Sequence, residues 1–177
     1  MQVRTLPTAV ACAATWLLCA CAAPTLPAVP DALRVGGSES LMLVAAAKGV
    51  QVYECRAANE SSAPDEWVFI APEAELFDGR GNPIGKHGAG PYWQALDGSR
   101  TLGTAKARVD APVGDAIPWL LLTARPDGPS GVFSKVTSVQ RVNTIGGKAP
   151  SSVCSRSQYG TTARVPYSAD YYFYTTR

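Results

Sequence analysis

Short runs of apolar and β-branched residues, each bounded by turn residues, recur along most of this chain. The runs cover residues 41–45, 50–55, 66–71, 74–77, 117–122, 131–145 and 171–174. Runs of this length predict β-strands, and the continuous apolar run 117–122 is typical of a strand buried on both faces. The only helix candidate, 41–47, lacks a second supporting turn. The pattern therefore predicts an all-β fold, a single-domain sandwich or barrel of about eight to ten mostly antiparallel strands.

Turn residues set the expected ends of these strands. Lys48 and Gly49 separate the first two runs, and Pro72 closes the third. Residues 78–82, DGRGN, are typical of a tight turn, and the polar stretch 57–65 is typical of an exposed loop. We therefore expect separate strands on either side of Gly49 and on either side of Pro72.

The sequence around Trp93 predicts a β-hairpin. Asp97 and Gly98 form a dipeptide that favours a two-residue turn, which would place Trp93 opposite Leu102 and Ala95 opposite Arg100. Alternation then puts Trp93, Ala95, Leu102, Thr104 and Lys106 on one face, and the expected core face holds Tyr92, Gln94, Leu96, Thr101, Ala105, Ala107 and Val109. On the outer face Trp93 would be a platform for sugars or other flat ligands. The alternative is that Trp93 plugs the barrel mouth or lies beneath a loop.

Composition and charge narrow the class of protein. The chain has 177 residues, 46% of them apolar, which is enough for one core. Its formal charge is +2 and it contains no basic run, so nothing predicts nucleic acid as a partner. Arg141, among apolar neighbours, is expected to be an ion-pair partner within the sheet rather than an anion site. We expect a single β domain over residues 31–177.

The N-terminus has the features of an export signal. Arg4 precedes the apolar run 9–18, which is too short to span a bilayer and is typical of a signal peptide. Residues 18–21, LCAC, resemble the lipobox of bacterial lipoproteins, in which the last cysteine receives lipid. Residues 1–21 are therefore expected to be a lipoprotein signal peptide with its lipobox, and the protein would meet the membrane through lipidated Cys21.

The residues after Cys21 bear on where the protein resides. Ala22, rather than an aspartate, follows Cys21. In bacterial lipoproteins this is typical of sorting to the outer membrane, and the domain would then face the periplasm or the exterior. The alternative is ordinary cleavage after Ala22, which would release a secreted soluble protein. Residues 22–30 contain three prolines and are expected to form a stiff, extended tether.

The five cysteines divide between the leader and the domain. Cys12 and Cys19 would leave with the signal peptide, and Cys21 would carry lipid. Cys55 and Cys154 remain, and such a pair in an oxidising compartment is expected to form a disulfide. The alternative, two metal-binding thiolates, lacks the closely spaced partner that zinc sites use. We therefore predict one long-range disulfide, no metal site and no cofactor.

His87 is the only histidine of the chain, and Gly85, Gly88 and Gly90 surround it. These glycines favour a sharp bend or a bulge at this position. A catalytic role would require a nucleophile or an orienting carboxylate within reach of the imidazole. The carboxylates available in principle are Asp97, Glu73 and Asp78. The chain contains no G-x-S-x-G, H-E-x-x-H or phosphate-loop motif, so no catalytic residue is assigned.

An ordered set of motifs resembles a known family. The motifs are QVYEC (51–55), WVF (67–69), PEA (72–74), GKH (85–87), GPYW (90–93), DGS (97–99), IPWLL (117–121), VQRVNT (139–144), GGKAP (146–150), Cys154 and VPYSADYYFY (165–174). Over roughly residues 31–176 they resemble the family called domain of unknown function 3455, found in secreted bacterial and fungal proteins. The resemblance implies one extracytoplasmic domain with Cys55 paired to Cys154, and no established activity. Some members carry a dehydrogenase label, for which this chain has no dinucleotide fingerprint.

Three functions are compatible with these features. The first is a binding module at the cell envelope for a small molecule or glycan, with a cleft near His87, Tyr92, Trp93 and Asp97. The second is a structural envelope protein that packs against other proteins. The third is a hydrolase that uses His87 together with Asp97 or Glu73. We favour the binding module.

Overall fold

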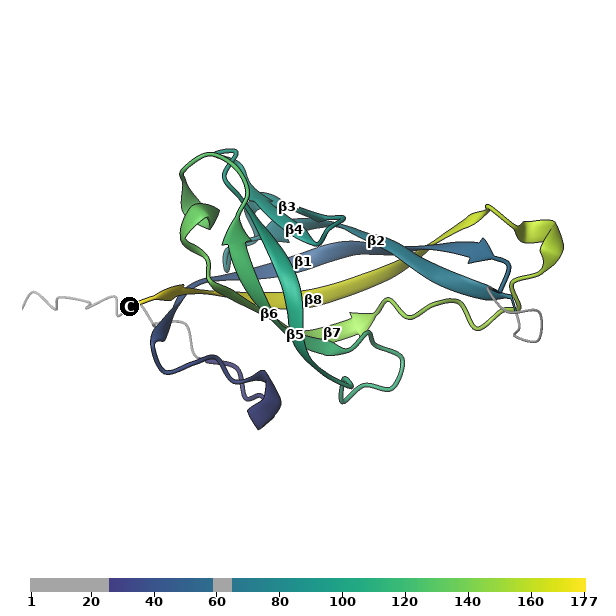
Figure 1. Cartoon of the computed structure of the whole chain (residues 1–177), viewed down its shortest axis with the longest axis horizontal. Coiled ribbons are helices and arrows are strands. Elements are labelled where there is room, and N and C mark those ends of the chain that lie inside the picture. Colours follow the sequence, from purple (N-terminus) through teal and green to yellow (C-terminus); the bar gives the residue numbers. More distant parts are fainter. Residues whose placement is uncertain (1–25, 59–64) are drawn as a thin grey trace, which may run out of the picture.

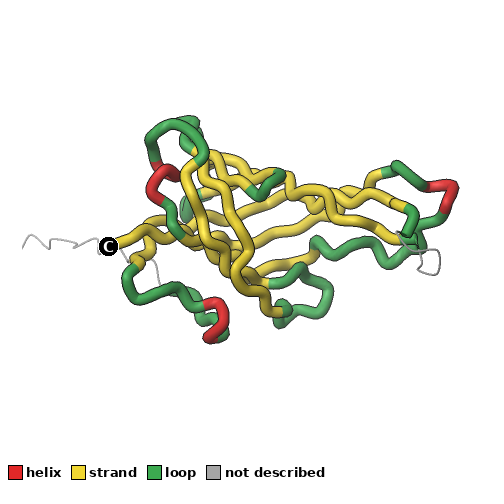
Figure 2. Tube along the Cα trace, viewed as in Figure 1, coloured by secondary structure: helices red, strands yellow, loops and turns green. Residues whose placement is uncertain are grey.

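The computed structural model describes residues 26–58 and 65–177. The expected leader, Cys21 and the first part of the expected tether lie outside the described residues. The described part is built from strands and short 3-10 helices (Figures 1 and 2). In chain order these are η1 (Asp31–Leu33), β1 (Glu39–Arg56), β2 (Glu66–Phe77), β3 (Pro83–Gly88), β4 (Tyr92–Ala95), β5 (Arg100–Val109), β6 (Trp119–Pro126), η2 (Val132–Lys135), β7 (Ser138–Gly146), η3 (Arg156–Gln158) and β8 (Thr162–Thr176).

The eight strands close into one barrel. Each strand pairs antiparallel with the next in sequence, and β8 pairs with β1 to complete the ring. Alternate side chains of β8 point into the barrel, where Tyr171 and Phe173 pack against Trp93 and Leu76. The predicted all-β, antiparallel fold is confirmed, and its strand number falls within the expected range. An interior of this size is filled by side chains or holds one small ligand.

Three strands continue beyond the barrel as an arm, formed by residues 50–56, 66–73 and 162–166. The pairing of β3 with β2 stops at Ala74, and that of β7 with β8 stops at Tyr167. The pairing of β1 with its two neighbours continues to Arg56 on one side and to Glu54 on the other. Figure 1 shows β1, β2 and β8 extending together to one side of the shorter strands.

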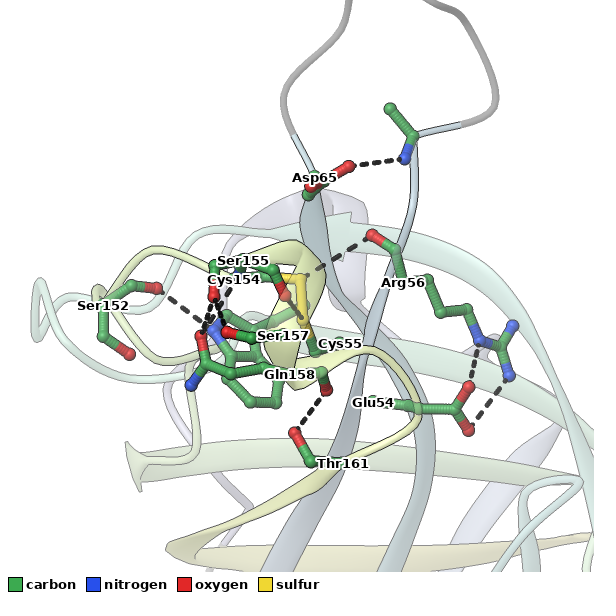
Figure 3. Close-up of a disulfide and its surroundings, with 12 residues drawn as sticks. Glu54, Cys55, Arg56, Asp65, Ser152, Cys154, Ser155, Ser157, Gln158 and Thr161 are labelled. Carbon is green, nitrogen blue, oxygen red and sulfur yellow. Dashed lines mark hydrogen bonds and ion pairs between the residues drawn. A yellow bond between two sulfur atoms is a disulfide. The ribbon is translucent and has the colours of Figure 1, made fainter.

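A disulfide fastens the far end of the arm. Cys55 near the end of β1 is bonded to Cys154, with their Cα atoms 5.5 Å apart (Figure 3). Cys55 also exchanges backbone hydrogen bonds with the segment before β8, donating to Thr161 O and accepting from Gly160 N, each at 3.0 Å. Nearby, the Trp67 indole nitrogen donates to Ser152 O at 3.1 Å. The predicted pairing is confirmed, and these two sulfurs are therefore not metal-binding thiolates.

Two predicted strand breaks are wrong. β1 runs without interruption through Gly49, so residues 41–47 are strand and Lys48 does not turn the chain. Gly49 serves a different purpose, because a Cβ there would overlap the Glu73 carbonyl oxygen on β2. β2 likewise continues through Pro72, which lies opposite Gln51 and beyond the last residue paired with β3. Proline is tolerated there because β3 does not extend far enough to need its amide.

The turn at residues 78–82 is confirmed, whereas the hairpin at Asp97 has a different register from the one predicted. Gln94 lies opposite Arg100 and Trp93 opposite Thr101, and Ala95 N donates to Ser99 O at 2.9 Å, which leaves residues 96–98 as a three-residue loop. Gly98 donates to Ala95 O at 3.1 Å and adopts φ +84°, the geometry of a turn followed by a left-handed glycine. The extra residue moves the side chains of β4 to the opposite face from the one predicted, whereas Thr101 on β5 keeps its predicted place in the core.

This change of face puts Trp93 inside the barrel. Trp93, Ala95 and Thr101 are buried, while Leu96, which was expected in the core, is 76% exposed. Gly103 follows Thr101 on the inner face, where a Cβ would lie 2.7 Å from Cζ3 of Trp93. The alternative prediction, in which Trp93 plugs the barrel mouth or lies beneath a loop, is closer to its position, which is in the barrel core.

An N-terminal segment, residues 26–38, lies against the outside of the barrel. Its helix η1 contacts β5 and β6, and Leu33 is completely buried. The Gln140 amide nitrogen donates to Leu33 O at 2.6 Å, while the Tyr174 hydroxyl donates to Gln140 Oε1 at 2.6 Å. The apolar run at the start of β6 is therefore covered on both faces, with Leu122 in the barrel core and Leu121 buried outside that core, as predicted.

Candidate functional site

The four residues predicted to line one cleft occupy three different environments. His87 and Trp93 are 4% and 1% exposed, and their rings stack in the barrel core with centroids 4.7 Å apart and planes 12° apart. Tyr92 faces the opposite side of its strand, toward a surface groove to which His87 also contributes. Asp97 lies in the hairpin turn and binds the backbone of η2.

The imidazole of His87 is held as a neutral core group. Its Nδ1 lies 2.7 Å from Tyr92 O, and because a carbonyl only accepts, Nδ1 carries the proton. The Tyr171 ring packs against it at 5.0 Å. Burial lowers the pKa of His87 from 6.5 to about 3, partly offset by the Tyr92 hydrogen bond, with Arg141 lowering it further. The ring is therefore uncharged at neutral pH.

The three carboxylates considered as partners of His87 have other partners. Glu73 accepts from Arg164 at 2.6 Å, and Asp78 binds the backbone and side chain of Asn82. Oδ1 of Asp97 accepts from both the amide and the hydroxyl of Ser99, and these contacts lower the pKa of Asp97. The described residues thus do not assemble a carboxylate–histidine pair of the kind a hydrolase needs.

Asp97 organises the loop that closes one end of the barrel. Its Oδ2 accepts from Val132 N at 2.9 Å, and the Ser99 hydroxyl accepts from Phe133 N at 3.0 Å. Phe133 in η2 is completely buried and packs on Phe173, with ring centroids 4.7 Å apart. Asp97 therefore positions a hydrophobic plug.

Tyr92 lines a groove of about 620 Å³ on β1, β2 and β3. The charged side chains along this groove are Lys48, Glu73, Glu75, Lys86 and Arg164. The Tyr92 ring lies against Gly88, where a Cβ would come within 2.6 Å of Cε1, so this position requires glycine. The Arg100 guanidinium lies over the same ring, 5.5 Å from its centroid. Because Arg100 already occupies a place over the ring, Tyr92 offers little stacking surface to a ligand.

A second cavity, here called the Trp119 cleft, separates the N-terminal segment from the barrel wall. Its volume is about 990 Å³, in the range of small-molecule sites. Residues 26–30 and 34–37 form one wall, and the other includes Trp119, Gln140 and Tyr174. The indole Nε1 of Trp119 is buried and has no hydrogen-bond partner among the described residues. Trp119 therefore brings to this region an aromatic ring and a donor that is not yet used.

Trp119 was not predicted as a site residue. It opens β6 opposite Val109 and belongs to the apolar run that predicted a strand buried on both faces. That run signalled that some segment covers its outer face, but no pattern identified residues 26–38 as the cover. The arrangement of Trp119 in a cleft beneath this segment depends on tertiary structure that the local sequence does not encode.

Arg141 does not form the ion pair that was expected. Its Nε and Nη2 both donate to Pro118 O, at 3.1 and 2.8 Å, and it has no carboxylate partner among residues 26–58 and 65–177.

Within the same residues, no group of three or more His, Cys, Asp or Glu side chains is placed to hold a metal ion. No helix in this part of the chain is both long enough and apolar enough to cross a membrane.

Comparison with known proteins identifies one family. The model of the family described as "Protein of unknown function (DUF3455)" matches residues 36–175, which is most of the chain and includes all eight strands except the last residue of β8. No curated protein matches the chain significantly.

Proposed function

The chain belongs to the DUF3455 family, and we propose that it is a cell-envelope lipoprotein whose barrel binds a small flat or hydroxyl-rich molecule, such as a glycan, in the Trp119 cleft. The observation that carries this proposal is the buried, unpartnered indole N–H of Trp119. A buried donor without an acceptor costs free energy, and a ligand oxygen that accepts from it removes that cost.

The charges of the cleft favour an uncharged ligand. Two cations and two carboxylates line it, so neither sign dominates. They are Arg34, Arg177, Glu39 and Asp110. Hydroxyl groups both donate and accept, and so suit a wall that offers both kinds of partner. An aromatic ring beside such groups is typical of sites for sugars and other flat molecules.

The proposed anchor places this cleft close to the membrane. Cys21 would carry the lipid, and residue 26, only five positions later, already lines the cleft. The extended tether then leads directly into the segment that forms one wall. Intact-mass analysis of membrane fractions tests the anchor: a diacylglyceryl-modified Cys21 supports it, and an unmodified chain beginning at Ala23 contradicts it.

Binding is tested by a glycan array and a thermal-shift screen of the processed protein, which is the chain without its expected leader. We expect a ligand that raises Tm, and expect Trp119→Ala to weaken its Kd by roughly tenfold or more. Trp119→Phe keeps a ring but lacks the donor, and should give an intermediate Kd. Trp67→Phe changes an indole on the arm and is the matched control.

A ligand whose Kd is the same for wild type and Trp119→Ala would contradict the proposed site. Failure of every small-ligand screen, with co-purification of another envelope protein, would instead favour the structural alternative.

A further inference from the structure

Several buried polar atoms of the barrel have no hydrogen-bond partner among the described residues. One is Nε1 of Trp93 in the core, and three lie together at the end where the arm begins: Nε2 of Gln51 and the hydroxyls of Tyr167 and Tyr171. The side chains of these three are 2%, 5% and 1% exposed, so water outside the barrel does not reach them. Buried polar groups are normally hydrogen-bonded, and three exceptions in one region point to a bound species.

Strand pairing gathers these groups on one side of the barrel interior. Tyr171 lies opposite Arg141 on β7, and Tyr167 lies on the same face of β8 as Tyr171. Gln51 follows Gly49, the residue opposite Tyr167, on the same face of β1. Tyr167 and Gln51 also meet at Gly147: a Cβ there would lie 2.8 Å from Tyr167 Cβ and 3.1 Å from Gln51 Cγ.

The backbone around Gly147 closes this end of the barrel. Gly147 adopts φ +82°, its carbonyl accepts from the Tyr53 hydroxyl at 2.6 Å, and the neighbouring Gly146 carbonyl accepts from Ile117 N at 2.9 Å. The Gly147 backbone therefore packs closely beside Gln51 and Tyr167, which argues for a small species at this place.

The groups that meet here are predominantly donors. Arg141 brings a positive charge with no carboxylate partner among the described residues; its Nε and Nη2 donate to Pro118 O, and its side chain also interacts with the Tyr171 hydroxyl. Burial raises the pKa of Tyr167 and of Tyr171, although Arg141 acts in the opposite direction on both. Both hydroxyls therefore remain protonated at neutral pH, and each has a hydrogen to donate.

We propose that Gln51, Arg141, Tyr167 and Tyr171 form an internal site for a small monovalent anion, either a halide or the carboxylate of a short acid. One positive charge surrounded by hydroxyl and amide donors matches one negative charge, and an anion that accepts from the buried donors removes the cost of leaving them without a partner. This site lies at the arm end of the barrel interior, so it is independent of the Trp119 cleft on the outside.

The test is thermal unfolding of the processed protein at constant ionic strength, with gluconate replaced stepwise by chloride or by formate. Gluconate, which is much larger than chloride or formate, serves as the reference anion. We expect a saturable rise in Tm, reaching about 5–10 °C at a hundred times Kd. If chloride raises Tm at a lower concentration than formate, the site prefers a halide. If formate does so, the site prefers a carboxylate.

Variants assign the effect to the site. Arg141→Gln should abolish the rise, and Tyr167→Phe and Tyr171→Phe should each weaken Kd about tenfold while preserving the ring. Arg164→Gln, which removes a cation from an exposed ion pair outside the barrel, should leave Kd unchanged. A rise that is equal in wild type and in both tyrosine variants would overturn the proposal.

Crystals of the wild type grown in bromide give a readout that does not depend on how the variants fold. An anomalous peak among Gln51, Arg141, Tyr167 and Tyr171 supports the site. Equal Tm values in gluconate, chloride and formate, with only water at these four side chains, would overturn it.

Discussion

The imidazole of His87 lies almost parallel to the indole of Trp93, with ring centroids 4.7 Å apart inside the closed barrel. The only histidine of the chain is thus a packing residue that stays neutral because it is buried. Because the pairing of β3 with β4 buries this ring, it also affects how the stability of the protein depends on pH.

Stability should fall as the pH drops below 6.5. The pKa of His87 is about 3 in the folded protein and near 6.5 in the unfolded chain, so only the unfolded chain binds a proton in this window. The free energy of unfolding should therefore decrease by up to about 1.4 kcal/mol per pH unit. Urea unfolding at pH 6.5 and pH 5.0 measures this slope before most carboxylates titrate.

The matched variant is His87→Phe, which keeps an aromatic ring on Trp93 but cannot bind a proton. Its stability should change much less between pH 6.5 and pH 5.0. An equal slope in both proteins would show that other groups cause the pH dependence.

Gly103→Ala should destabilise the fold. A Cβ at this position would lie 2.7 Å from Cζ3 of Trp93 and 3.1 Å from Cδ2 of Leu122, and neither neighbour has free space. Overpacking of this kind costs about 1–3 kcal/mol, measurable as a lower midpoint in urea. Gly114→Ala is the control, because nothing lies within 4 Å of a Cβ there. Equal midpoints for the two variants would contradict the packing of Trp93.

Removal of the disulfide should be costly. Cys55 and Cys154 are 99 positions apart, so their bond restricts the unfolded chain strongly. The double variant Cys55→Ser/Cys154→Ser should lose about 2–5 kcal/mol of unfolding free energy. Adding a reductant should lower the unfolding free energy of wild type to that of the double variant. The unfolding free energy of the double variant should not change. No loss on reduction would mean that the arm needs no covalent fastening.

Asp97→Ala should release η2 without unfolding the barrel. Val132 N donates to Asp97, and Phe133 N donates to Ser99, whose hydroxyl in turn donates to Asp97. Hydrogen exchange at the Val132 and Phe133 amides should accelerate by about tenfold or more. Asp78→Ala, which alters a different turn, should leave both amides protected. Unchanged exchange in Asp97→Ala would contradict the anchoring role of Asp97.

Some of the patterns that the sequence expresses locally were interpreted correctly. DGRGN forms its turn because Asp78 binds two amides of that same turn. The pairing of Cys55 with Cys154 was predicted from their number and from the compartment expected for the protein. The strand composition of the chain also predicted the fold class, although it did not distinguish a barrel from a sandwich.

The errors arose where the partner of a residue is distant in sequence. Gly49 resembles a turn glycine, but its role is to let β1 approach the Glu73 carbonyl on β2. Asp97 and Gly98 resemble a two-residue turn, but the loop has three residues, which moves Trp93 to the inner face. One residue of register decides whether that tryptophan faces a ligand or the core.

The Trp119 cleft is tested most directly by the indole N–H signals in a ¹⁵N NMR titration of the processed protein. Beyond the expected leader the chain has three tryptophans, at positions 67, 93 and 119, so each gives one assignable signal. With a ligand from the screen, the Trp119 signal should move and saturate, while those of Trp67 and Trp93 stay in place. A saturating shift at Trp67 or Trp93 with Trp119 unchanged would show that the ligand binds elsewhere.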